Sequence, residues 1–343
     1  MNSYSDATTQ TELPTVWLLP KALYVLEPEA TALLDQVNQR VWGTVDPALL
    51  EIIRLRIAWL IGNTAGMRAR SSPARIPEQK VAELPAYATS PLFSELDRDG
   101  VAFAEQFVMD VTGTSQDSLD ALRDQLGSDR LRDFVTSVYL VEFTQRLQLM
   151  AQALLPAVPD LSDAGRPGLR QGSLRELLGS YQDAVVRSTA LDPVTTELVR
   201  LRCARTHNCR ICQTLRMADA QTAGVDTEMT SKIDFYETSD LPEPHKIALR
   251  ITDAFIIRPD ALSADIVGPA RATFSPEQLA ELCLDITKWS TQKIHVALGT
   301  DGADGLPINE DGVVLFGFQD DGRVAGYWAD PEPPVVVPTD QGH

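Results

Sequence analysis

Hydrophobic residues recur at helical spacing along most of the chain. In the segment 47–61 the apolar positions fall on a single stripe: Leu50, Ile53, Ile57, Leu60 and Ile61. This spacing is typical of an amphipathic helix with one buried face. Similar periodicity predicts helices over 128–155 and 275–296. Strand patterns do not alternate with these helices, so the chain favours an all-α fold without a parallel sheet.

A polar residue followed by proline marks three of the expected helix starts. These pairs are Asp46-Pro47, Asp192-Pro193 and Ser275-Pro276. The Asp or Ser side chain can accept hydrogen bonds from the free amide groups of the first turn. Proline fits that turn because its missing N–H has no partner there. The three pairs therefore predict the residues at which these helices begin.

The end of the chain departs from the helical pattern. Segments 312–318 and 323–328 are rich in Val, Phe and Tyr, and they flank an Asp-Gly turn at 319–322. This arrangement predicts a β-hairpin. A lone hairpin is marginal in water, so we expect it to pack on the helical body or on a neighbouring subunit. The Pro- and Val-rich segment 331–338 predicts an extended tail.

The sequence also repeats itself. Segment 46–58 matches segment 192–204 with seven of thirteen positions identical. A repeat of this kind predicts two copies of one module of about 140 residues each. A Gly-rich stretch at 164–172 is the expected linker.

We therefore divide the chain into four parts. They are an N-terminal extension (1–20), a first module (21–160), a second module (161–305), and a hairpin with its tail (306–343).

The second module carries a Cys-x-x-Cys pair, Cys209 and Cys212. Thiols at this spacing on a helix share one face, so they can close a disulfide, and one can act as a nucleophile of low pKa. Thr206 to Asn208 predicts a helix break just before them, which would place both thiols in the first turn of a new helix. The first module has Asn63 and Gly66 at the matching positions. Only the second module can therefore carry out thiol chemistry.

The thiols together with Glu197, twelve positions before Cys209, resemble the motif of the alkylhydroperoxidase AhpD and carboxymuconolactone decarboxylase superfamily. The resemblance covers the second module and, in the first, segment 46–58. It implies an all-α fold, oligomers built from such modules, and peroxidase or disulfide-exchange activity. It also implies that Glu197 belongs to a proton relay, that Cys212 is the thiolate that meets peroxide, and that Cys209 resolves it to a disulfide.

Two positions depart from that motif. Arg216 stands where the superfamily keeps a His, and Ile211 lies between the cysteines where peroxidase members often have a second His. Arginine does not give up a proton near neutral pH, so it cannot replace a histidine base. We expect Arg216 to lie one turn after Cys212 on the same helical face. There it can hold a thiolate or bind a carboxylate with two hydrogen bonds. His207 is the only imidazole that we expect near the thiols, and it could take over proton transfer.

Structural roles compete with catalytic ones at several of these residues. Glu197 and Arg216 have twins, Glu51 and Arg70, in the module without thiols, and His207 matches the apolar Ile61. All three side chains can therefore be architectural. Other residues whose default role is structural are Cys203 and Cys283, expected in the core, and Lys288 and Trp289, expected on a helix surface or lining a pocket. A zinc site would need four ligands, and no second paired motif supplies them.

Composition limits the choice of partners. The formal net charge of −18 argues against nucleic acid and against anionic membrane surfaces. The chain has neither a secretory pattern at its start nor a long apolar run, so we expect a cytoplasmic protein. We expect a homo-oligomer, no cofactor and no metal, a small hydroperoxide or small acid as substrate, and a thiol protein as reductant.

Three functions remain open. The first is an oxidoreductase, an AhpD-like peroxidase that cycles a Cys209–Cys212 disulfide. The second is a carboxymuconolactone decarboxylase-like enzyme without redox chemistry, in which Arg216 would anchor a small lactone or carboxylic acid and His207 or Glu197 would act as acid and base. The third is a non-catalytic scaffold.

Overall fold

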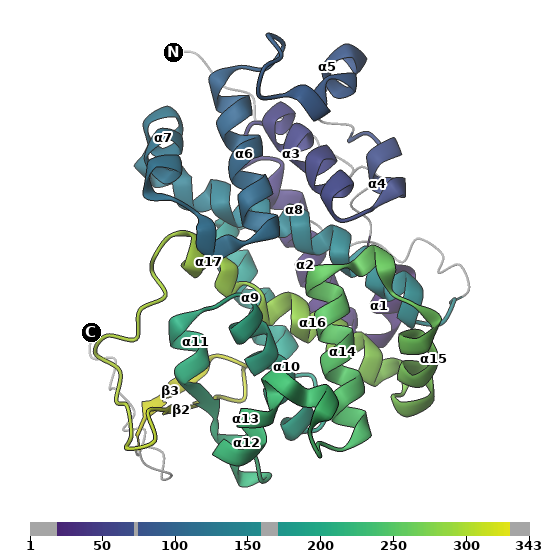
Figure 1. Cartoon of the computed structure of the whole chain (residues 1–343), viewed down its shortest axis with the longest axis vertical. Helices are drawn as coiled ribbons and strands as arrows, with labels where there is room; N and C mark the ends of the chain where they lie inside the picture. Colours follow the sequence, from purple (N-terminus) through teal and green to yellow (C-terminus); the bar gives the residue numbers. More distant parts are fainter. Residues whose placement is uncertain (1–18, 72–74, 159–170, 330–343) are drawn as a thin grey trace.

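A computed structural model gives the fold of residues 19–71, 75–158 and 171–329. These parts of the chain are mostly helical, with a small three-stranded sheet near the C-terminal end (Figure 1). The mostly helical fold is therefore confirmed. The expected linker and tail, and nearly all of the N-terminal extension, lie outside the described residues.

The first half of the chain forms α1 to α8. Their bounds are α1 Lys21–Leu26, α2 Pro28–Val41, α3 Pro47–Leu60, α4 Thr64–Arg68, α5 Glu78–Ala82, α6 Glu95–Met109, α7 Gln116–Leu126 and α8 Ser128–Leu154. The predicted start of α3 is confirmed, because the Asp46 carboxylate accepts hydrogen bonds from the amides of Ala48 and Leu49.

The second half is helical up to residue 297. Its helices are α9 Leu174–Val186, α10 Pro193–Thr206, α11 Arg210–Thr214, α12 Ala218–Thr222, α13 Thr227–Ser231, α14 Glu243–Ile257, α15 Ala264–Thr273, α16 Pro276–Trp289 and α17 Gln292–Ala297. Asp192 caps α10, and Ser275 caps α16 in a capping box with Gln278. The single helix expected over 275–296 is wrong, since the chain breaks between α16 and α17.

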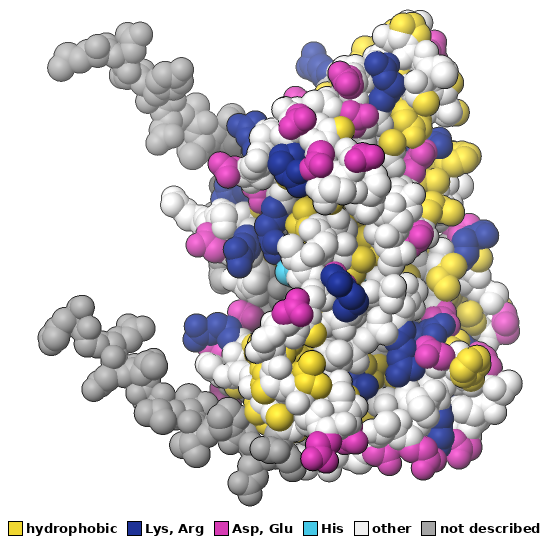
Figure 2. Space-filling model, turned by 60° about the vertical axis from the view of Figure 1, so that its left-hand side comes forward, with side chains coloured by type: hydrophobic (Ala, Val, Ile, Leu, Met, Phe, Trp, Pro, Cys, Tyr) yellow, Lys and Arg dark blue, Asp and Glu magenta, His cyan; other side chains and the backbone are white. Residues whose placement is uncertain are grey.

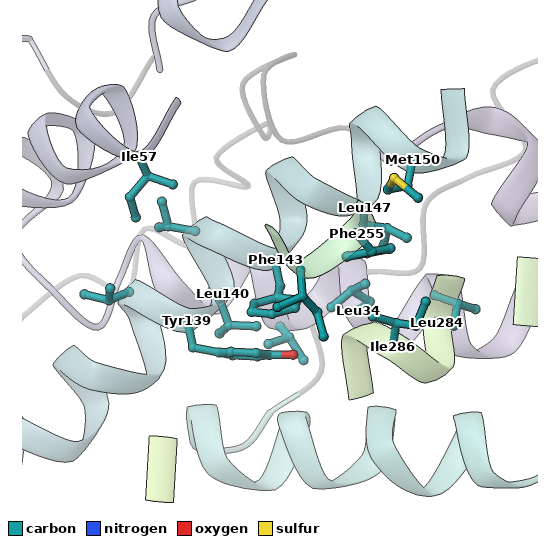
Figure 3. Packing of buried hydrophobic residues seen from close by; sticks show 14 of the residues in the cluster. Leu34, Ile57, Tyr139, Leu140, Phe143, Leu147, Met150, Phe255, Leu284 and Ile286 are labelled. Carbon is teal, nitrogen blue, oxygen red and sulfur yellow. The ribbon is translucent and has the colours of Figure 1, made fainter. Parts of the chain in front are cut away.

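The long helix α8 lies at the centre of one large hydrophobic core. The rings of Tyr139 and Phe143 stack with centroids 4.9 Å apart, and Phe143 stacks on Phe255 of α14 at 6.2 Å (Figure 3). The Tyr139 hydroxyl donates to the Thr287 carbonyl of α16. This core takes residues from both expected modules, and the boundary between 160 and 161 stays a prediction.

The C-terminal hairpin is confirmed, with β2 Val314–Phe318 antiparallel to β3 Val324–Trp328. Its packing on the body is also confirmed, through a third strand that the sequence did not predict. β1 Leu215–Met217 pairs in parallel with β2, so that Leu215 lies opposite Val314. The expectation of no parallel pairing is therefore wrong. The backbone at 215–217 leaves its helix in an extended form, and its polar groups need partners that β2 supplies.

Charged side chains of both signs share the surface. On the face shown in Figure 2, basic side chains lie among acidic ones, and acidic residues gather along the lower edge. No helix among the described residues is both long and apolar enough to span a bilayer.

Candidate active site at the thiol pair

A sharp turn joins α10 to α11 and positions the two thiols. α10 ends at Thr206, and Asn208 adopts a left-handed conformation with φ of 51°. Asparagine tolerates this conformation better than most residues. Cys209 then caps α11, and Cys212 lies inside it. The predicted break is confirmed, although the new helix begins at Arg210 rather than at Asn208.

A buried ion pair holds this turn in place. The Arg200 guanidinium contacts both Glu197 oxygens, at 2.6 Å and 2.8 Å. Its remaining N–H groups donate to the carbonyl oxygens of Cys212 at 3.0 Å and Leu215 at 2.5 Å. A Glu197 oxygen also accepts from the Met217 amide at 3.3 Å. Both side chains are at most 3% exposed. We call this arrangement the second clamp.

The segment around Glu51 and Arg54 has the same arrangement, which we call the first clamp. Arg54 contacts both Glu51 oxygens and donates to the carbonyls of Gly66 and Ala69, each at 2.8 Å. The Ser71 amide donates to Glu51 at 3.1 Å. Each of these five residues has its counterpart in the second clamp 146 positions later. Arg200 corresponds to Arg54, for example, and Cys212 corresponds to Gly66. The left-handed turn is matched too, by Gly62 with φ of 70°.

The two thiols influence each other's pKa and lie in unequal environments. Cys209 is fully buried, whereas Cys212 is half-buried, and both are free thiols. The interaction between the two thiols lowers the pKa of Cys209 and raises that of Cys212. Burial opposes ionisation of both, and the Arg200 cation favours it. The pair therefore loses its first proton more readily than its second.

Cys212 opens onto a cavity of about 270 Å³. Side chains from four helices, β1 and the hairpin line it: Gln182, Asp183, Val186, Arg200, Leu215, Lys288, Trp289, Thr291, Gln292, His295, Phe316, Phe318, Val324 and Tyr327. Lys288 is 6% exposed, and its Nζ lies 2.9 Å from the centre of the Trp289 ring. Burial, aided by the nearby Arg200, holds the pKa of Lys288 well below its usual value.

Two Mycobacterium tuberculosis proteins are similar to this chain. They are "Uncharacterized protein MT2376" and "Uncharacterized protein Rv2313c", each 34% identical over 225 residues. The match covers 63% of this chain and 79% of each relative. The chain belongs to their family. No protein-family model matches the sequence, and no solved structure matches it.

In this member of the family, the predicted site residues do not all meet. The residues that line the cavity include Cys212 but neither Glu197, His207 nor Arg216. Arg216 lies in β1, and its guanidinium donates to the carbonyls of Gln213 and Leu215. The expectation that it follows Cys212 on the same helical face is wrong. The second clamp draws the Leu215 carbonyl to Arg200, and α11 ends before it.

His207 is a core residue. It is 3% exposed, its Nε2 lies 3.1 Å from the Ser290 hydroxyl, and its ring meets Phe143 edge-on. Burial and the nearby Lys293 and Arg146 cations hold its pKa well below the usual range. The expectation that it is the only imidazole near the thiols is wrong, because His295 lines the cavity. Core positions for Cys203 and Cys283 are confirmed.

The sequence reasoning missed Arg200 and His295 and treated Lys288 and Trp289 as surface residues by default. A signal for Arg200 was present, because Glu and Arg recur three positions apart in both copies of the repeat. Such a pair forms an ion pair on one helix face. Among the described residues, no cluster of His, Cys, Asp or Glu could hold a metal ion.

Proposed function

We propose that the chain is a thiol-dependent oxidoreductase of the AhpD-like type that reduces a hydroperoxide or a disulfide. The observation that carries this proposal is the thiol pair itself. Two free thiols interact, one has a lowered pKa, and the other opens onto a cavity. Ionisable thiols with access to a small molecule are the features of reactive cysteines.

We also propose that the chain is a tandem duplication in which the first module has lost its thiols. The support is the match between the two clamps, in which equivalent hydrogen bonds recur 146 positions apart. The sequence identity of the two segments points the same way. The first module then serves as a packing partner for the second, through the shared core around α8.

The proposed reaction converts two thiols and a hydroperoxide to a disulfide, an alcohol and water. After proton exchange between the sulfurs, the Cys212 thiolate attacks the outer peroxide oxygen, the O–O bond breaks, and the alkoxide leaves. Cys212 is now a sulfenic acid. The Cys209 sulfur attacks the Cys212 sulfur, the S–O bond breaks, and the leaving hydroxide takes a proton. A dithiol reductant returns two electrons and two protons by thiol exchange.

Lys288 is the group that we propose to hold the proton released when the pair ionises. It lines the same cavity as Cys212, and its lowered pKa lets it pass the proton on to the leaving alkoxide. Glu197 is fully occupied by Arg200 and the Met217 amide. The chain then replaces the superfamily histidine by a lysine from another helix.

The test is a thiol variant with a matched control. We expect Cys212→Ser to abolish peroxide consumption, because its hydroxyl is a far weaker nucleophile. Cys283→Ala, which removes a buried core thiol, should retain it. On intact mass, peroxide should remove two hydrogens from the parent chain, reversibly with dithiothreitol. Unchanged turnover in Cys212→Ser would refute the thiol mechanism and point to an enzyme without redox chemistry.

A further inference from the structure

The C-terminal hairpin closes one side of the cavity next to Cys212. From it, Phe316, Phe318, Val324 and Tyr327 line the cavity. We infer that the hairpin is the substrate-selecting wall of the thiol site, and that it selects an organic hydroperoxide with an apolar, ring-bearing body over hydrogen peroxide. This inference rests on the proposed thiol-dependent function.

The hairpin and α16 together form a cluster of aromatic rings. The Phe318 ring lies 6.4 Å from Trp289 of α16, centre to centre, and 5.3 Å from Phe316 at a steep angle of 78°. Tyr327 stacks on Phe316 at 6.4 Å. Rings at these distances offer both edges and faces to a further ring. A substrate with an aromatic or branched apolar body would bury that body against them.

The charged groups of the cavity lie in the walls formed by helices, and the hairpin adds one polar group, the Tyr327 hydroxyl. Arg200 comes from α10, Cys212 from α11, Lys288 from α16 and His295 from α17. A small-molecule site of this type combines an apolar wall for binding with a few polar groups for orientation. The peroxide group would therefore face Cys212 while the apolar body faces the hairpin. Hydrogen peroxide has no body with which to use the hairpin wall.

The hairpin is fixed relative to the thiols at two places. On one side, β2 pairs with β1, which directly follows the thiol helix α11. On the other side, its turn packs against α9, where Arg187 donates to the carbonyls of Asp321 at 2.6 Å and Asp183 at 3.0 Å. Gly322 has φ of 87°, and an added Cβ would stand 2.8 Å from the Asp183 carbonyl carbon. Only glycine allows the turn to approach α9 this closely.

The test compares two substrates, cumene hydroperoxide and hydrogen peroxide, with the full chain and a dithiol reductant. In the parent, kcat/KM should be higher for cumene hydroperoxide. Phe318→Ala should lower kcat/KM for cumene hydroperoxide about tenfold, the size expected for losing apolar contacts in a pocket. Its value for hydrogen peroxide should stay unchanged. Phe235→Ala removes a ring that is 76% exposed and should change neither value.

A second variant, Gly322→Ala, displaces the turn from α9 without removing any lining side chain. We expect it to lower the preference for cumene hydroperoxide in the same way, with unchanged helical circular dichroism. If the parent shows no preference for cumene hydroperoxide over hydrogen peroxide, or if both variants keep the parent's preference, the inference about the hairpin is overturned. The proposed thiol function would still stand. A parent that consumes neither hydroperoxide would overturn the proposed function and this inference with it.

Discussion

The two clamps differ in what they hold. Each has a buried Glu–Arg pair at the end of a helix, and each Arg binds two carbonyls in the following turn. The first clamp holds Asn63 and Gly66, and the second holds Cys209 and Cys212. Because the clamp forms without thiols, the ion pair serves first to fix a turn. The buried position of Glu197 is therefore accounted for by its ion pair with Arg200, without a role in proton transfer.

The space beside the two turns differs as well. In the first, the side-chain Nδ2 of Asn63 donates to the Gln145 side chain of α8 at 3.1 Å, and its Oδ1 accepts from the backbone amide of Gly66. The turn is thus tied to the neighbouring helix. In the second, Cys212 faces a cavity that the hairpin closes. The fold supplies the same turn twice, and only the second of these turns has both a thiol pair and an adjoining cavity.

The largest effect should come from removing either guanidinium. Arg200→Met and Arg54→Met each leave a buried Glu without its partner, which costs about 3–5 kcal/mol of unfolding free energy. Urea denaturation of the two variants measures this cost. We expect the two variants to lose similar amounts of unfolding free energy. A large loss in only one of them would show that the two clamps are not equivalent.

The next test moves the thiols into the first turn. The double variant Asn63→Cys, Gly66→Cys should form a second disulfide under mild oxidation, because the backbone of the two turns matches. Intact mass would then fall by two further hydrogens. Losing the Asn63 hydrogen bonds should cost about 1–3 kcal/mol. If these thiols stay reduced under the same oxidant, the backbone of the first turn does not bring them together as the second turn does.

The pH dependence of the thiols tests the environment of the second turn. Since the interaction with Cys212 lowers the pKa of Cys209, thiolate absorbance should rise below the ordinary cysteine pKa of 9.0. Lys288→Met removes the proposed proton acceptor and should move this rise to higher pH. Lys288→Arg keeps a cation at this place and should shift it less. An unmoved titration in Lys288→Met would exclude Lys288 from the proton path.

The smallest effect concerns the left-handed residue of each turn. Asn208→Gly should change the melting temperature little, because glycine favours the same conformation. Gly62→Ala should cost about 1–2 kcal/mol for placing a Cβ at positive φ. That Cβ would also stand 2.6 Å from the Cβ of Asp260. An unchanged free energy of unfolding in Gly62→Ala would show that the backbone of the first turn shifts to accommodate the added Cβ.

The sequence predicted local structure well. Asp-Pro and Ser-Pro pairs marked true helix starts, and the Asp-Gly turn marked a true hairpin, because the forces involved act within a few residues. The helix break before the thiols also followed from local signals.

Contacts between distant segments were not predictable in the same way. The pairing of β1 with β2 joins residues about a hundred positions apart through backbone groups, which leave no mark on side-chain pattern. The end of α11 before Arg216 depends on a guanidinium fifteen positions before Leu215. Lys288 and His295 reach the thiols only through tertiary packing, so their place in the cavity required the structure.

Trp289 has a consequence for how this site can be observed. Its indole lies in the cavity wall that includes Cys212, with Lys288 over its face and the Arg200 guanidinium carbon 5.9 Å from its ring centre. Disulfides quench nearby indole emission more strongly than thiols do. The intrinsic fluorescence of this tryptophan is therefore a built-in optical reporter for the proposed disulfide cycle, readable in real time without a label.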